Sequence, residues 1–162
     1  MSELSVFEWL QATSMATAIR ESTWLFPTIE TLHVLALALV VGSIVMVDLR
    51  LLGLANRNRA VSSVLAEILP WTWAGFAVAT TSGLLLFSSA AMRYSGNALF
   101  VLKMGLLLLA GVNMAVFHLM TQRSLAQWDA GAFTPASARA SAAVSLSLWI
   151  SIVALGRWVG FV

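Results

Sequence analysis

Long apolar stretches separated by short polar ones run through the sequence, and they predict membrane-spanning helices. Uncharged runs occur at 31–47, 68–92, 104–122 and 140–156. A hydrocarbon core about 30 Å thick needs about 20 residues of helix, so flanking residues complete the shorter runs. We therefore expect four spans, at about 26–54, 66–92, 97–123 and 137–161.

The segment ahead of the first span, residues 4–20, has a weaker helical pattern. Apolar side chains recur at Phe7, Leu10, Met15 and Ile19, with polar residues elsewhere. This spacing predicts a short amphipathic helix that lies in the membrane interface.

Together these segments predict an all-α fold, an antiparallel four-helix membrane bundle with short loops. Pro70 is expected in the first turn of the second helix, where its missing N–H costs nothing. Residues 94–97 are expected to form a tight turn that makes the second and third spans antiparallel neighbours. Small residues on the second span, Gly75, Ser82 and Gly83, allow another helix to approach closely.

Composition supports a lipid environment and excludes several kinds of site. The chain is 60% hydrophobic and 10% charged, whereas a soluble domain is about 25% charged. It contains no cysteine, which excludes disulfides and thiolate metal sites. Its net charge is +2 without a basic stripe, so nucleic-acid binding is not expected.

Basic residues in the short loops predict the orientation of the bundle. The first and third loops carry five of them and the opposite side four: Arg50, Arg57, Arg59, Arg123 and Arg139, against Arg20 and Arg93 together with Lys103 and Arg157 inside the helices. Cytoplasmic loops of membrane proteins are enriched in Lys and Arg. The first and third loops should therefore face the cytoplasm, with both termini on the opposite side.

Polar side chains inside the spans are the candidate functional residues, because such groups usually face the bundle interior and have a function. At a rise of 1.5 Å per residue, His33 of the first span lies roughly 10 Å below the membrane surface. Lys103 of the third span lies at nearly the same depth, with Glu30 and Arg157 nearer that surface. These four residues form an expected outer cluster.

A second polar cluster is expected near the opposite surface, where the sequence places His118, Asp48, Arg50 and Asn113. It lies roughly 20 Å from the first along the membrane normal, so one haem held between His33 and His118 is not expected. Three roles are open for His118: a second haem ligand, a contact for a quinone, or a hydrogen-bond partner of Asp48 or Asn113. We favour the hydrogen-bond role.

Three interpretations of the outer cluster compete. In the first, His33 is an axial ligand of haem b, with Lys103 or the neighbouring Met104 as the other. In the second, the polar groups are structural ion pairs that join Glu30 to Lys103 or Arg157. The same interpretation pairs Asp48 with Arg50.

The third interpretation is a copper site. Thioether sulfurs suit Cu(I), and the candidate ligands are His33, Met46, Met104 and Met114.

Two segments resemble known membrane proteins. The first span contains Glu30-Thr-Leu-His33 and then an apolar run to Asp48-Leu-Arg50. The third contains Leu102-Lys103-Met104 and a leucine run to Asn113. They resemble the HemJ-type protoporphyrinogen oxidases and the copper-resistance D (CopD) proteins, and the whole chain is similar to an uncharacterised four-helix family of bacteria.

The HemJ resemblance implies a b-type haem held by His33 and Lys103. Because the groups that the chain resembles are bacterial, the inner membrane of a bacterium is the expected location, and the basic loops then predict that both termini are periplasmic. The expected function is electron transfer by a small cytochrome-like protein, or, if it is an enzyme, by a membrane-bound oxidoreductase. Arg157 would pair with a haem propionate, and Glu30 would orient His33. A quinone or redox protein is the expected partner, and the chain is expected to self-associate or join a larger membrane complex. The alternative is a non-catalytic subunit or a copper-handling protein.

Overall fold

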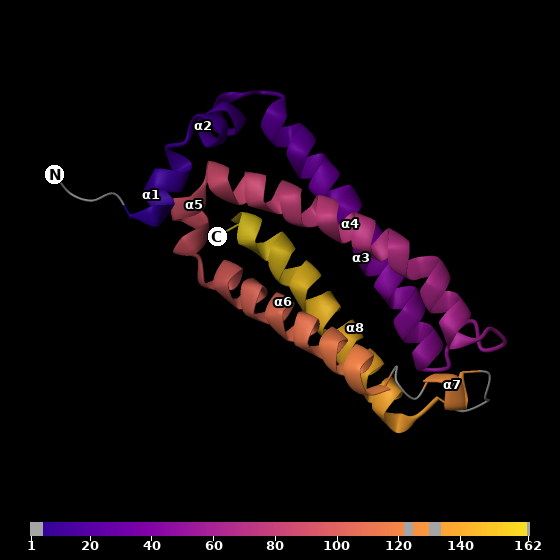
Figure 1. Ribbon diagram of the computed structural model, residues 1–162. Helices are drawn as coiled ribbons and strands as arrows, with labels where there is room; N and C mark the ends of the chain where they lie inside the picture. Colours follow the sequence, from indigo (N-terminus) through magenta and orange to yellow (C-terminus); the bar gives the residue numbers. More distant parts are fainter. Residues whose placement is uncertain (1–4, 122–124, 130–133, 162) are drawn as a thin grey trace.

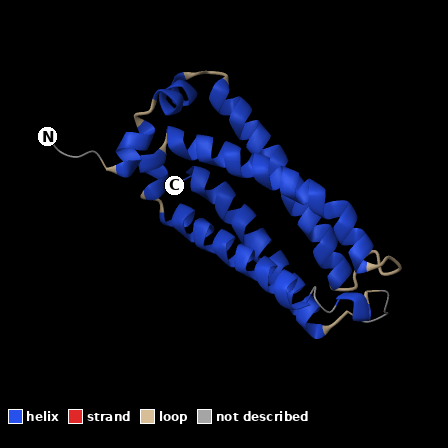
Figure 2. Ribbon diagram, viewed as in Figure 1, coloured by secondary structure: helices blue, strands red, loops and turns tan. Residues whose placement is uncertain are grey.

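The computed structural model describes residues 5–121, 125–129 and 134–161, and the regular elements in these residues are all helices (Figure 2). Four helices are long and apolar enough to cross a membrane: α3 (Leu25–Leu51), α4 (Val61–Ser89), α6 (Ala98–Val116) and α8 (Ala136–Trp158). A π-helical turn, Phe117–Thr121, extends α6, and a 3₁₀ turn, Val159–Phe161, extends α8. The remaining helices are short: α1 (Val6–Gln11), α2 (Ser14–Glu21), α5 (Ala91–Ser95) and α7 (Leu125–Trp128). The predicted all-α membrane bundle of four spans is confirmed.

The four long helices pack as two pairs. Helix α3 packs along α4, α6 packs along α8, and the pairs meet where α3 contacts α8 (Figure 1). The second and third spans were predicted to be antiparallel neighbours. They run antiparallel (Figure 1), but the prediction that they are neighbours is wrong, since α4 and α6 belong to different pairs.

The connection between α4 and α6 explains this separation. Instead of a tight turn, the chain breaks at Ala90 (φ −144°, ψ 40°) and forms α5 before α6 begins. Phe87 at the end of α4 stacks on Phe100 at the start of α6, with ring centroids 5.4 Å apart, and Tyr94 of α5 packs against both rings. This aromatic cluster joins the two helices at one end of the bundle.

Helices α3 and α4 approach closely because α4 presents small residues. A Cβ placed on Gly75 would lie 3.1 Å from Cγ2 of Val40 and 3.2 Å from Cδ2 of Leu39. The Thr72 hydroxyl donates to Ser43 Oγ across the same interface, at 2.8 Å. Small residues commonly allow such packing in lipid, where burial of apolar surface contributes little to the association of helices. Pro70 lies in the interior of α4, because the helix begins at Val61 rather than near residue 66.

Two apolar clusters fill the bundle. One lies in its middle and is formed by Val40, Ala110, Trp149 and Ile152. The other lies toward the loops that precede α4 and α8, and is formed by Leu51, Val61, Leu65, Phe117, Ala138 and Ala142. We call the end of the bundle with these loops the loop end, and the end with the two chain termini the terminus end (Figure 1).

The expected interfacial helix at 4–20 is two helices, α1 and α2, and residue 4 lies outside the described residues. The chain turns at Thr13, whose hydroxyl oxygen accepts from the Ala16 backbone N–H at 3.3 Å and caps α2. Phe7 of α1 packs edge-on against Phe87, with centroids 6.2 Å apart. The two helices thus pack beside the aromatic cluster at the terminus end.

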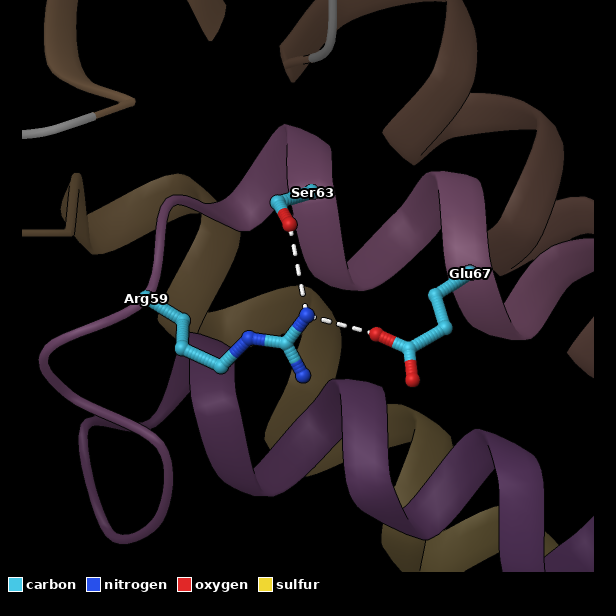
Figure 3. A network of polar contacts seen from close by, with 3 residues as sticks. All are labelled: Arg59, Ser63 and Glu67. Atoms are coloured by element: carbon cyan, nitrogen blue, oxygen red, sulfur yellow. Dashed lines mark hydrogen bonds and ion pairs between the residues drawn. The ribbon is translucent and has the colours of Figure 1, made fainter.

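Polar contacts join the end of α3, the loop that follows it and the start of α4 at the loop end. Buried Arg50 donates from Nε to the Arg59 carbonyl at 2.8 Å. The Arg59 guanidinium in turn bonds Ser63 and forms an ion pair with Glu67 at 2.5 Å (Figure 3). Both members of that ion pair are well exposed, so it contributes little to stability.

Asp129 caps α4 from a distant part of the chain. The Ser62 backbone N–H donates to its Oδ1 at 2.7 Å, and the Ser62 hydroxyl donates to its Oδ2. The hydrogen bond from the Ser62 hydroxyl and, to a smaller extent, the one from the Ser62 backbone N–H stabilise the carboxylate. They therefore hold the pKa of Asp129 below its usual value. A depressed pKa means that this contact stabilises the fold above about pH 4 and is lost as the pH falls through the folded-state pKa.

We therefore expect Asp129→Ala to lower the thermal unfolding midpoint in detergent by about 3 °C at pH 7, as loss of a helix cap does. The difference from the unsubstituted protein should shrink near pH 3. Near-ultraviolet circular dichroism at both pH values measures this, with Glu30→Ala at the exposed terminus end as control. An equal difference at both pH values would contradict a charge-dependent cap.

Candidate functional site

His33 lies at the α3–α4 interface, about 12 Å along α3 from Leu25. Its Nδ1 is 3.0 Å from Oγ of Ser82 on α4. The imidazole fits there because Gly83 has no side chain: a Cβ at that position would lie 3.0 Å from Cε1 of His33. Ser82 and Gly83 together therefore position the ring.

The hydrogen bonds at Ser82 favour one tautomer of His33. The Ser82 hydroxyl lies 2.6 Å from the Val78 carbonyl and 3.2 Å from the Ala79 carbonyl, and it can donate to either. When it does so, its oxygen accepts from a proton on Nδ1 of His33 at 3.0 Å. In that tautomer the lone pair of Nε2 is open to a ligand.

Lys103 enters the site from the other helix pair. Its side chain extends from α6 and lies against Gly156 of α8. A Cβ placed on Gly156 would lie 3.5 Å from Nζ and 3.6 Å from Cε of Lys103. The residues that the structure describes include no hydrogen-bond or ion-pair partner for the Lys103 ammonium. A cation at this depth without a partner is costly, so it calls for a group that the nitrogen can bind.

The aromatic cluster shows how His33 and Lys103 lie relative to one another. Gly83, against which the His33 ring packs, is one helical turn from Phe87, and Lys103 is one turn from Phe100. Because Phe87 and Phe100 stack face to face near the terminus end, His33 and Lys103 both lie on the side of this stack that faces the middle of the bundle. Lys103 is close enough to His33 to act on it electrostatically. Both side chains of the central pair of the expected outer cluster therefore lie toward the terminus end, and no hydrogen bond joins them among the described residues.

The other expected members of the outer cluster are less well placed. Glu30 is exposed one turn above His33 and acts on it only electrostatically. The orienting contact to Nδ1 comes from Ser82 instead. Exposed Arg157 lies next to Gly156, with its guanidinium 4.6 Å from the Phe161 ring. Met104 is 49% exposed on the outside of α6.

The members of the second expected cluster form hydrogen bonds with other residues rather than with one another. His118 Nδ1 bonds to the Met114 carbonyl of its own helix at 2.9 Å, rather than to Asp48 or Asn113. Asn113 Nδ2 donates to the Ser141 carbonyl at 3.0 Å, and its Oδ1 accepts from the Ser141 hydroxyl at 3.1 Å. Arg123, counted among the basic loop residues, lies outside the described residues.

The expected structural ion pairs do not form. In the described part of the chain, Arg59–Glu67 is the one ion pair, so neither Glu30 nor Asp48 has a cationic partner within ion-pair distance. Asp48 and Arg50 are two positions apart, or about 200° around a helix, and side chains with that spacing do not face each other.

The proposed copper ligands do not converge either. Met46, Met104 and Met114 are 50%, 49% and 42% exposed. Met46 is also about 20 Å from His33 along α3.

Sequence reasoning missed the residues that hold the site. Ser82 and Gly83 were visible as small residues at the depth of His33 on an antiparallel helix, but packing alone accounted for them. Gly156 gave no sequence signal, because only the packing of α6 on α8 shows that Lys103 lies against it.

A family model matches residues 6–162. The chain belongs to DUF6644, a family of unknown function. No curated protein and no solved structure was found to match it. The match includes all four spanning helices, so His33 and Lys103 both lie in the region that defines DUF6644.

We expect His33 of this DUF6644 protein to be protonated on Nδ1, and Gly83→Ala to displace its ring. Nitrogen-15 NMR of histidine-labelled protein distinguishes the tautomers, and His118→Ala assigns the second histidine. Gly105→Ala is the matched control, since a Cβ there meets nothing within 4 Å. Equal His33 spectra in the two glycine variants would contradict the contact with Gly83.

Proposed function

We propose that the chain binds a b-type haem at the terminus end, with His33 and Lys103 as axial ligands, and transfers electrons within the membrane. The observation that carries this proposal is the pairing of a histidine whose Nε2 is available with an amine that has no partner among the described residues. The two residues belong to opposite helix pairs, and counting residues from the span ends puts them at similar depth.

The donor set fits such a group. Haem iron accepts an imidazole nitrogen, and a second axial ligand together with buried surroundings tunes its reduction potential. When bound, the haem supplies reversible one-electron transfer. The contact of Ser82 with Nδ1 favours the imidazole tautomer that ligation needs, and the Phe87–Phe100 stack lies on the terminus-end side of Gly83 and Lys103. Arg157, exposed beside Gly156, is available to a propionate.

The resemblance to HemJ-type proteins supports the same pair of residues, because it matches a first-helix histidine and a third-helix lysine to His33 and Lys103. Lys103 is favoured over Met104 as the second ligand, since the Met104 side chain faces outward. The CopD resemblance receives less support, because the methionines do not converge on His33. A quinone or a redox protein remains the partner that this function needs.

A second candidate function, a non-catalytic subunit of a membrane complex, is favoured by α6. This helix buries the smallest share of its residues among the four spans. Its outward face includes Leu108, Leu109 and Val112, a surface for lipid or for another membrane helix.

The optical spectrum of the detergent-purified protein tests the proposal. Protein expressed with ample haem should show a Soret band and, after dithionite reduction, sharpened α and β bands. His33→Ala should remove at least nine-tenths of these bands, because it removes a ligand. His118→Ala, the matched control, should leave them unchanged.

Protein that folds but has a flat spectrum would exclude the cytochrome function and favour the subunit. Equal loss in both histidine variants would indicate a general effect on folding instead of ligation at His33.

We also propose that the loop end faces the cytoplasm of a bacterium and that both termini are periplasmic. Arg57, Arg59 and Arg139 are exposed at the loop end, in accord with the enrichment of basic residues in cytoplasmic loops.

Single cysteines test this orientation directly, because the chain has none. Ala12→Cys at the terminus end and Asn58→Cys at the loop end are both exposed. A membrane-impermeant maleimide added to intact spheroplasts should label Ala12→Cys and leave Asn58→Cys unlabelled until the membrane is permeabilised. The reverse pattern would invert the assigned orientation.

A further inference from the structure

Asp48 is a buried carboxyl near the loop end of α3, and the haem proposal makes no use of it. Its residue is 5% exposed. Among the buried side-chain polar atoms of the described residues, its Oδ2 is the one without a hydrogen-bond partner. Such an atom is rare, because buried polar groups are nearly always satisfied.

No cation neutralises this carboxyl. On α3 itself, Arg50 points away and bonds the Arg59 carbonyl, while the Arg59 guanidinium pairs with Glu67 of α4. On α8, Arg139 is exposed. Beyond the end of α6, His118 is engaged with its own backbone. Asp48 thus faces no charged group at ion-pair distance among the described residues.

The surroundings of Asp48 are a thin polar layer between the two apolar clusters. The Ser145 hydroxyl of α8 lies close enough to the carboxyl to interact with it. One turn along α8, Ser141 pairs with Asn113 of α6. Asp48, Asn113 and Ser145 each lie in sequence between a residue of the middle cluster and a residue of the loop-end cluster, on their own helix or its extension.

An ionised carboxylate is very costly in such a layer, whereas a neutral carboxyl costs far less. A proton is the smallest partner that removes the charge, and it needs no further ligands. Asp48 is three residues from Leu51, the last residue of α3, so it lies about 4.5 Å along the helix from the loop end.

We propose that Asp48 is a proton-binding site inside the membrane, which takes up and releases one proton at the loop end. The carboxyl gains a proton on uptake and returns to the carboxylate on release, with no other bond changed. Ser145 interacts with the carboxyl in both forms and is a positioning residue. This site is separate from His33 and Lys103, and it does not depend on the haem.

Infrared difference spectroscopy of the full-length protein in lipid vesicles tests this proposal, with sodium-free buffer at a series of pH values. At neutral pH we expect the carbonyl stretch of a protonated carboxyl, with a small downshift in D₂O. Asp48→Asn should remove this band. Glu30→Gln, which alters an exposed carboxylate, should leave it unchanged. Ser145→Ala should keep the band and shift it to higher frequency, because the contact with the Ser145 hydroxyl is lost.

The Ser145→Ala shift keeps the test decisive if Asp48→Asn fails to fold. The proposal is overturned if the band is absent at neutral pH, if it survives in Asp48→Asn, or if Ser145→Ala leaves its frequency unchanged. Loss of the band on adding sodium at constant pH would also overturn it, since Asp48 would then be a cation ligand.

Discussion

The close contact between α3 and α4 is the constraint on which the rest of the structure depends. It exists because α4 presents Gly75, Ala79, Ser82 and Gly83 to α3 at helical spacing, so the two backbones approach without a layer of large side chains. The same contact places the His33 ring against Gly83 and its Nδ1 against Ser82. Packing and chemistry therefore share one interface, and a change that loosens it alters both.

The two-pair arrangement also decides which polar groups can meet. His33 belongs to the α3–α4 pair and Lys103 to the α6–α8 pair, so a group that binds both would join the pairs near the terminus end. At the loop end, Asp129 joins α4 to the segment after α6. Between these ends the pairs meet mainly through α3 and α8, with Trp149 and Ile152 packed near Val40.

Hydropathy predicted the four spans because a backbone in lipid has to satisfy its own hydrogen bonds, which leaves helices as the simple solution. Counting residues along antiparallel helices placed His33 and Lys103 at one depth. Neighbour relations could not be obtained in this way, since both faces of a spanning helix are apolar. The small residues of the second span marked its packed face, but they did not indicate which helix packs there. The pairing of Asp48 with Arg50, however, was excluded by helix geometry already in the sequence, because a spacing of two residues separates side chains by about 200°.

The separation of His33 from Asp48 limits how strongly the two proposed sites can influence each other. They are 15 positions apart on one straight helix, or about 22 Å. With an effective dielectric constant of about 20, unit charges at that distance interact by about 0.75 kcal/mol. This energy changes a proton affinity by less than about fourfold, since about 1.4 kcal/mol corresponds to a factor of ten. Electrostatics through the middle cluster therefore couples electron transfer at one end only weakly to proton binding at the other. Strong coupling would require a movement of α3 against α4, the contact that holds His33.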